Sequence, residues 1–135
     1  MRYHIEELRF DGEKILCRGW AVPEELSDRL IVTLRDENEQ QLPVQVEMSP
    51  RPDVVAAICG VENTSRDYGF SFTLAPEDRA FARLHMNAEN FQIDHAVKLI
   101  EIRELVSAWR KEHTFFGKLK KKRQQRKAEK AAGTR

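Results

Sequence analysis

The residues with the clearest chemical potential are aromatic and charged side chains that could bind a polyhydroxylated ligand. Trp20 and Tyr68 each stand beside a glycine, and Arg51 and Asp53 flank a proline. Sugars present C–H faces to aromatic rings and hydroxyls to charged groups, so these four residues are candidate ligand-binding residues. Each also has a structural interpretation. The aromatic rings would belong to a core, and Arg51 and Asp53 would fix a loop and the start of a helix.

Motifs of catalysis are missing from the sequence. It contains no Gly-rich phosphate loop and no HExxH, GxSxG or CxxC motif. His85 and His95 stand on separate predicted strands, which is typical of ordinary sheet-face or loop histidines. Cys17 and Cys59 are 42 positions apart with no partnering His/Cys cluster, so they are expected to be small buried residues. We therefore expect a noncatalytic module without a cofactor or a metal.

The charge of the chain is unevenly distributed. Residues 110–135 hold 11 Lys/Arg against 2 Asp/Glu, a net charge of +9, whereas residues 1–109 hold 12 against 20, a net charge of −8. The basic segment is interpreted as a linker or as a contact for a polyanion. Nucleic acid is disfavoured, because the body lacks interleaved basic and aromatic positions and its negative charge would repel a polyanion. An anionic membrane surface is favoured, because it attracts the Lys and Arg side chains and the Phe115-Phe116 pair could insert shallowly beside them. The contact residues would be Lys118, Lys120, Lys121, Lys122, Arg123, Arg126 and Lys127.

Length and composition indicate one domain. The chain has 135 residues, of which 41% are hydrophobic and 33% are charged, enough for one modest core. No apolar run approaches the ~20 residues of a membrane span, and the first residues lack the apolar region of a secretory signal. These features predict a cytoplasmic protein, with the basic segment able to lie on the inner face of the membrane.

The elements that would position the candidate residues are short strands. Residues 3–10 and 14–22 alternate in hydropathy around Asp11-Gly12, a strong hairpin signal, and the first run changes parity as a strand with a local irregularity would. Further strands are predicted at 30–34, 41–48, 68–74, 81–86 and 91–99. Pro52 and Gly60 bracket a helical turn at 54–58.

This pattern predicts a mainly β fold, an Ig-like antiparallel β-sandwich over residues 1–100, because no amphipathic helix separates the strands. A C-terminal helix is predicted over 101–116, followed by a basic extension over 117–135. The helix would dock through a stripe containing Leu99, Ile102, Leu105, Val106 and Trp109. The predicted core contains Leu42, Val44, Val46, Phe70, Phe72, Leu74 and either Ile31 or Val32.

Three short motifs occur in an order that resembles a known family. Arg18-Gly19-Trp20-Ala21, Arg51-Pro52-Asp53-Val54 and Tyr68-Gly69-Phe70-Ser71-Phe72 follow one another within residues 3–100. This order resembles the N-terminal β-sandwich accessory domain of bacterial family 2 (GT-A) glycosyltransferases, which build cell-surface polysaccharides. The chain departs from that architecture by containing neither a nucleotide-sugar fold nor a DxD motif, so transferase activity is not carried over.

The resemblance implies a noncatalytic interaction module in surface-polysaccharide synthesis. Its partners would be a glycosyltransferase catalytic domain, supplied in cis or in trans, and an acceptor glycan. The alternative left open is an adaptor that binds a membrane surface or nucleic acid through the basic segment. An enzyme would need a convergent polar pocket, which sequence alone does not reveal.

Overall fold

The computed structural model describes residues 1–60, 66–90 and 93–114. The predicted extension 117–135 lies outside these residues. The named elements are β1 (Arg2–Phe10), β2 (Ile15–Val22), β3 (Leu30–Arg35), β4 (Glu47–Ser49), α1 (Pro52–Cys59), β5 (Gly69–Leu74), β6 (Ala82–Ala88) and β7 (His95–Ile100). The chain is again helical over 102–114. No helix in the described ranges is long and apolar enough to cross a membrane.

The first hairpin forms where Asp11-Gly12 predicts it. The Asp11 carboxylate accepts hydrogen bonds from the backbone N–H groups of Glu13 and Lys14 at 2.8 and 2.7 Å, and Gly12 takes a φ of 100°. A side chain is strained in that conformation, whereas glycine is not. The β1–β2 register shifts between Ile5 and Glu7, which confirms the predicted irregularity as a β-bulge.

The strand predicted at 41–48 is mostly wrong. Only β4 joins a ladder, apart from a single bridge between Gln41 and Arg35. Leu42 donates its N–H to the carbonyl of Leu34 in β3 at 2.8 Å, whereas Met48 pairs with Phe70 in β5. The segment therefore crosses from the edge of one sheet to the edge of the other. Pro43, which has no N–H to donate, stands within this crossing.

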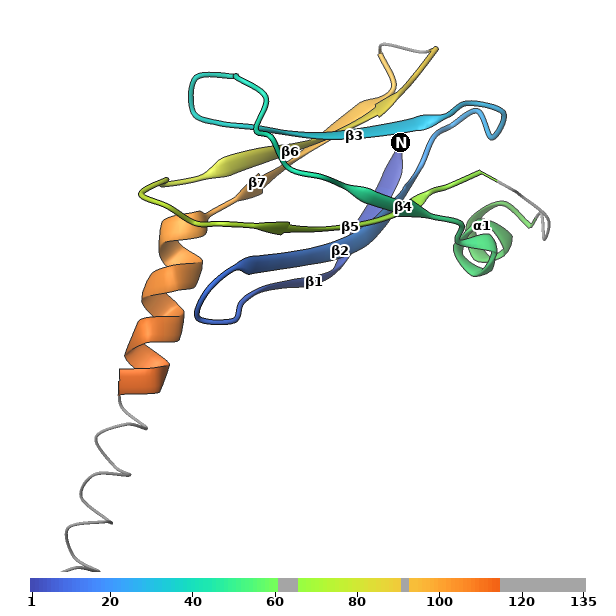
Figure 1. Cartoon of the computed structure of the whole chain (residues 1–135). Helices are drawn as coiled ribbons and strands as arrows, with labels where there is room; N and C mark the ends of the chain where they lie inside the picture. The colour runs from blue at the N-terminus through green and yellow to red at the C-terminus, as the bar shows by residue number, and fades with distance from the viewer. Residues whose placement is uncertain (61–65, 91–92, 115–135) are drawn as a thin grey trace, which may run out of the picture.

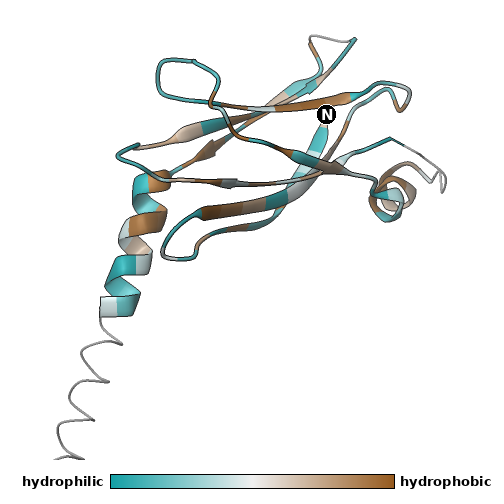
Figure 2. Ribbon diagram, viewed as in Figure 1, coloured by the Kyte–Doolittle hydropathy of each residue, from teal (hydrophilic) through white to brown (hydrophobic). Residues whose placement is uncertain are grey.

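The strands form two antiparallel sheets, one with the order β1-β2-β5-β4 and one with the order β3-β6-β7. Figure 1 shows the sheets as two layers, with α1 at one end and the C-terminal helix leaving the other. A mainly β fold of two antiparallel sheets is therefore confirmed. Figure 2 shows hydrophobic residues recurring along the strands, and the buried ones form one core between the layers.

The predicted core is correct for Leu42, Phe70, Phe72 and Leu74, which are buried, while Val44 and Val46 are half-buried against it. In β3 the buried residues are Leu30 and Leu34, with Val32 packed against them. Ile31 faces outward and is 40% exposed, so its alternative placement in the core is wrong. Four of the six residues of this strand are apolar, on both parities, and the pattern alone does not say which parity is buried.

The C-terminal helix docks on the first hairpin through Trp109. The Trp109 ring meets Phe10 edge-on at 5.4 Å and stacks on His113 at 3.9 Å. It also fills the space beside Gly12, where an added Cβ would lie 2.6 Å from the ring. Ile102 is buried and Leu105 and Val106 pack on the core, as the stripe predicts. Leu99 is the exception, being 45% exposed on β7.

Candidate functional site

Three of the four candidate ligand-binding residues lie on or beside the outer face of the four-stranded sheet. Trp20 pairs with His4 of β1 on one side and with Gly69 of β5 on the other. Arg51 lies at the N-terminus of α1, and its side-chain stem lies over Gly69. The sheet register therefore places Trp20 and Arg51 next to each other, with Asp53 joined to Arg51.

Gly69 makes this approach possible. A Cβ at this position would lie 2.7 Å from Cγ of Arg51 and 2.8 Å from Oγ of Ser49, closer than side chains pack. The absence of a side chain lets Arg51 lie flat against β5. The guanidinium then crosses β2 beside Trp20 and reaches β1.

The Arg51 guanidinium is held by two carboxylates. Its Nη1 donates to Oε1 of Glu6 at 2.5 Å, and its Nε and Nη2 each donate to Asp53 at 3.1 Å. The Arg51 and Glu6 side chains are 24% and 27% exposed, whereas Asp53 is 67% exposed. Two-point contacts of this kind fix the plane of a guanidinium. Arg51 is thus pre-positioned on the face rather than free to move.

The same contacts determine the protonation states of Arg51, Glu6 and Asp53. Hydrogen bonds from Arg51 lower the pKa of Glu6 and the pKa of Asp53, and they outweigh the opposing effect of desolvation. The two carboxylates in turn raise the pKa of Arg51. All three groups are charged at neutral pH, so the cluster offers carboxylate acceptors and a guanidinium donor rather than an acid or a base.

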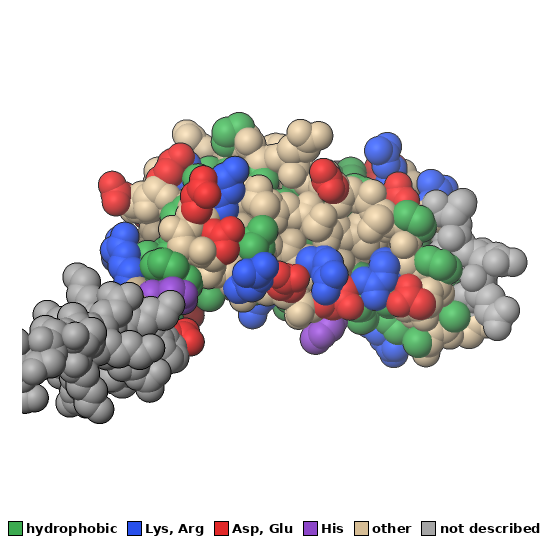
Figure 3. All heavy atoms as spheres, turned by 60° about the horizontal axis from the view of Figure 1, so that its bottom comes forward, with side chains coloured by type: hydrophobic (Ala, Val, Ile, Leu, Met, Phe, Trp, Pro, Cys, Tyr) green, Lys and Arg blue, Asp and Glu red, His purple; other side chains and the backbone are tan. Residues whose placement is uncertain are grey.

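A hollow of about 410 Å³ continues along the same face. Its polar lining includes Glu7, Arg18, Gln45, Glu47, Ser71 and Thr73. Figure 3 brings this side forward and shows positive and negative side chains alternating along it. The volume is in the range of about 300–1,000 Å³ typical of small-ligand sites.

Cys17 borders the hollow but is not a nucleophile. It is buried, and desolvation, assisted by the Glu7 carboxylate, raises the pKa of its thiol to about 12. A thiol with this pKa stays protonated at neutral pH. Cys17 and Cys59 are both free, and Cys59 is exposed, so the prediction of burial holds for the first and is wrong for the second.

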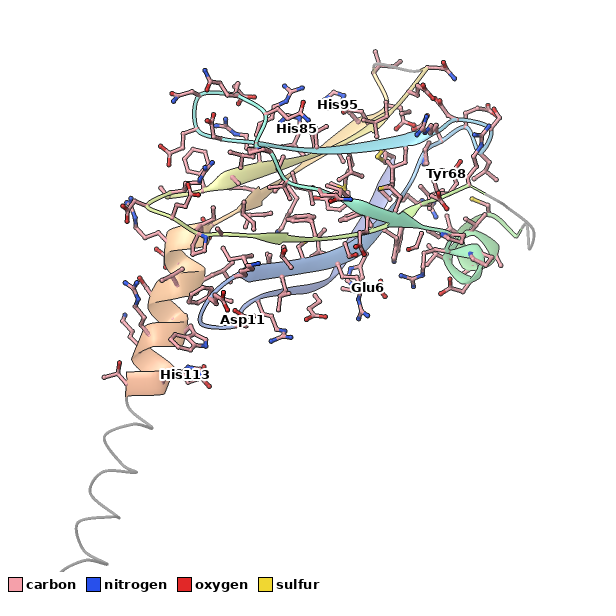
Figure 4. The ribbon with its side chains drawn as sticks, viewed as in Figure 1. Glu6, Asp11, Tyr68, His85, His95 and His113 are labelled. Carbon is pink, nitrogen blue, oxygen red and sulfur yellow. The ribbon has the colours of Figure 1, made fainter. Side chains whose placement is uncertain are left out.

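Tyr68 does not join the face, and the prediction of a stacking contact at this residue is wrong. The side chain is fully buried, and its hydroxyl lies 2.7 Å from the carbonyl oxygen of Leu26 and 2.8 Å from that of Asp28, so both oxygens compete for its one proton. Figure 4 shows Tyr68 away from Glu6, toward the end of the molecule that holds α1. The ring ties the loop before β3 to the start of β5 and has no free side for a sugar.

Buried Asp28 belongs to the same structural cluster. Its Oδ1 accepts hydrogen bonds from the backbone N–H of Arg29 at 2.9 Å and of Asn90 at 3.0 Å, and from Nδ2 of Asn90 at 3.1 Å. Three donors satisfy the carboxylate without a cation. Asp28 thus anchors the loop before β3 to the turn after β6.

The sequence did not identify Glu6 as part of the candidate site. Glu6 lies in the β-bulge, where the extra residue is aimed differently from its neighbours. The parity change in residues 3–10 is the one sequence signal that points to the bulge and thus to Glu6. It does not identify the partner of Glu6, because Arg51 is 45 residues away along the chain. The predicted polyanion contacts Lys118, Lys120, Lys121, Lys122, Arg123, Arg126 and Lys127 lie outside the described residues.

Comparison with family models, with curated proteins and with solved structures finds no match to this chain. Within the described ranges, no three His, Cys, Asp or Glu side chains are grouped so that they could hold a metal ion.

Proposed function

We propose that this protein is a noncatalytic interaction module that binds a glycan on the outer face of its four-stranded sheet. The observation that carries this proposal is the position of Arg51, which is held across the sheet between Glu6 and Asp53, beside half-buried Trp20. The adjoining hollow supplies hydroxyl, amide and carboxylate groups.

The chemistry of a sugar suits this arrangement. An indole ring offers an apolar surface to C–H groups, while carboxylates and a fixed guanidinium exchange hydrogen bonds with hydroxyls. Because the ion pairs already hold Arg51, binding would not have to immobilise a free side chain. A neutral or weakly charged glycan is favoured, since the charges of both signs on this face are largely paired with one another.

The partner of the module would be a glycosyltransferase. This part of the proposal depends on the order of the GWA, RPDV and GF motifs, which resembles the accessory domain of family 2 enzymes. The module would position the catalytic domain, in cis or in trans, relative to the acceptor glycan. Such a role places it in the cytoplasm, at the inner face of the membrane where lipid-linked glycans are assembled.

We also propose that the sandwich is Ig-like. In a constant-type immunoglobulin domain the first, second, fifth and fourth strands form one sheet, and the third, sixth and seventh form the other. The orders β1-β2-β5-β4 and β3-β6-β7 support this assignment.

A second candidate is an adaptor that binds an anionic membrane or nucleic acid through the basic segment. The observation that favours it is the charge split, with 11 Lys/Arg against 2 Asp/Glu in residues 110–135. Binding of this kind should fall steeply with salt and require Lys118–Lys130, with the sandwich dispensable.

The experiment for glycan binding is a glycan array probed with the full chain, followed by calorimetric titration of the best neutral oligosaccharide. Trp20→Ala and Arg51→Gln should each weaken binding at least tenfold, because each removes a contact that the other cannot replace. Arg79→Gln is the matched control, since Arg79 also pairs with a neighbouring carboxylate, that of Glu77, at 2.9 Å.

Circular dichroism of each variant separates lost binding from lost folding. The proposal is overturned if the protein binds no glycan on the array. It is also overturned if the glycans that bind the native protein bind the Trp20 and Arg51 variants as tightly. Equal loss in the Arg79 variant would show that the effect is not local to the candidate face.

A further inference from the structure

The two parts of the proposed glycan face lie at different positions along β2. Trp20 belongs to a cross-strand row with His4 of β1 and Gly69 of β5. The next β2 residue on the same face is Arg18, which pairs with Ser71 of β5. Arg18 and Ser71 line the hollow of about 410 Å³, whereas Trp20 does not. The indole ring and the hollow are therefore neighbouring places on one face and not one pocket.

The ion pair between Arg51 and Glu6 lies between these two places. The stem of Arg51 lies over Gly69, which belongs to the row of Trp20. The guanidinium extends to Glu6 in the β-bulge, and the residue after the bulge, Glu7, borders the hollow. Neither Arg51 nor Glu6 lines the hollow itself. A ligand that contacts both the indole ring and the hollow must therefore pass over this ion pair.

The length of this path exceeds that of one sugar ring. Leu16 lines the hollow and stands four positions before Trp20 in β2. Because a strand rises about 3.3 Å per residue, the two residues are roughly 13 Å apart along the strand. A pyranose ring is shorter than this distance, so one sugar can occupy the indole ring or the hollow but not both. Linked sugars are needed to use the whole face.

The hollow has polar groups that are open to a ligand. Glu47 is exposed, and its carboxylate has no hydrogen-bond or ion-pair partner among the residues that the structure describes. Gln45 and Thr73, which line the same hollow, are also exposed. Sugar hydroxyls can donate to the Glu47 carboxylate without displacing a described partner. Half-buried Leu16 offers an apolar contact for the C–H groups of the same sugar.

We propose that this face binds an extended oligosaccharide that lies along β2, with one sugar unit on Trp20, another in the hollow beside Glu47, and their linkage above the ion pair. This inference rests on the proposed function and specifies its class of glycan as an oligomer. His4, whose ring lies 6.2 Å from that of Trp20 at an angle of 49°, would border the first unit. Because the units are joined, the second binds at a high effective concentration once the first is in place, so the oligomer binds more tightly than its separate sugars.

The first test is calorimetric titration of the full chain with the neutral oligosaccharide that binds best on the array, and with its fragments down to the monosaccharides. The oligosaccharide should bind at least tenfold more tightly than any of its monosaccharides, because only the oligosaccharide spans the indole ring and the hollow. Glu47→Ala should weaken the oligosaccharide at least fivefold. Glu104→Ala is the matched control, since Glu104 is an exposed glutamate of the C-terminal helix whose carboxylate also has no described partner.

The second test is an NMR titration of the ¹⁵N-labelled full chain with the same oligosaccharide, which locates the ligand. The indole N–H signal of Trp20 should shift together with the backbone amide signals of Gln45 and Thr73, on the other side of the ion pair. The amide signal of Asn87, on the three-stranded sheet, should not move. Circular dichroism of the Glu47 variant confirms that it keeps the native fold.

These measurements separate the failure of the inference from the failure of the proposed function. If no glycan binds, or if the Trp20 and Arg51 variants bind normally, the proposed function fails and the inference fails with it. If a glycan binds through Trp20 and Arg51 but a monosaccharide binds as tightly as the oligosaccharide, the proposed function stands and the extended ligand is overturned. The same conclusion follows if the Glu47 variant binds normally or if the Gln45 and Thr73 signals do not shift.

Discussion

The outer faces of the two sheets differ in how their partly buried polar side chains are paired. On the four-stranded sheet, Arg51 is bound by Glu6 and Asp53, and Arg9 is bound by Glu7 at 2.6 Å. On the three-stranded sheet, Arg35 is only loosely paired, and unpaired polar atoms are buried beside exposed apolar side chains. Loosely paired arginines, Arg18 and Arg35, occur on both faces, so the difference between the faces lies in what is buried: the four-stranded sheet half-buries a paired arginine, and the three-stranded sheet buries polar atoms without a described hydrogen-bond partner.

This difference predicts different responses to substitution on the two faces. Removing Arg51 leaves two carboxylates without their partner, which costs stability. Removing a buried polar group that has no described partner costs little or stabilises the fold. Both faces belong to sheets that share one core, so a substitution in that core should have the largest effect on stability.

Replacing Tyr68 should have the largest effect. Tyr68→Ala should lower the free energy of unfolding by about 3–5 kcal/mol, because it removes a buried ring and leaves a cavity. Tyr68→Phe should cost about 1 kcal/mol through the lost hydroxyl contacts. Urea denaturation measures both. Tyr3→Ala, at a tyrosine that is 39% exposed, is the control and should change stability by less than ~0.5 kcal/mol. A similar cost at both positions would contradict the structural role of Tyr68.

Removing one arginine from each face tests the difference in pairing directly. Arg51→Gln should lower the urea midpoint by roughly 0.3 M at low salt, and less at high salt, because two carboxylates lose their cation. Arg35→Gln should have a smaller effect. The pKa values of Glu6 and Asp53 are lowered in the folded state, so the Arg51 contribution should be full above their unfolded values, about 4, and disappear as pH falls through the folded ones. Equal midpoints for the two variants at low salt would remove the distinction between the faces.

Two threonines on opposite faces offer a matched comparison. Thr33→Val should stabilise the protein by about 0.5–1 kcal/mol, because it removes a buried hydroxyl with no described partner. Thr73→Val, at an exposed position on β5, should change stability by less than ~0.5 kcal/mol. Chemical denaturation of both variants in one buffer measures the contrast. A destabilised Thr33 variant would show that this hydroxyl already has a partner in the free protein.

The smallest expected effect is a pH dependence due to His85. Its pKa is lowered in the folded state, mainly by desolvation, so below about 6.5 the unfolded chain binds a proton more readily than the folded one. Stability should therefore decrease from pH 7 to pH 5, and His85→Gln should flatten this decrease. Urea midpoints across this range provide the measurement, with Thr73→Val as a variant that keeps the native slope. An unchanged slope in the His85 variant would contradict its burial as a neutral group.

Local patterns predicted much of the fold. The Asp11-Gly12 hairpin, the alternation in 68–74 and the Pro52 start of α1 depend on neighbours in sequence, and each is found where it was predicted. The crossing at 42–46 was predicted as a strand because alternation reports which side is buried and not whether a ladder partner is present.

The candidate site was less predictable because its contacts join distant parts of the chain. Arg51 and Asp53 form a local pair, but the link to Glu6 spans 45 residues and depends on the bulge. The burial of Tyr68 could not be predicted from its neighbours in sequence, because the carbonyls that its hydroxyl contacts lie 40 or more residues earlier, in a loop.

The contact between Gly12 and Trp109 fixes how closely the C-terminal helix lies against the first hairpin, in addition to the packing of Ile102, Leu105 and Val106 on the core. An added methyl at position 12 would lie 2.6 Å from the indole, and it would also strain a residue whose φ is 100°. Gly12→Ala would thus force the indole ring away from the hairpin, while Ile102 remains in the core that the two sheets share. The position of the Trp109 end of the helix against the hairpin is therefore set by the absence of one carbon atom at residue 12.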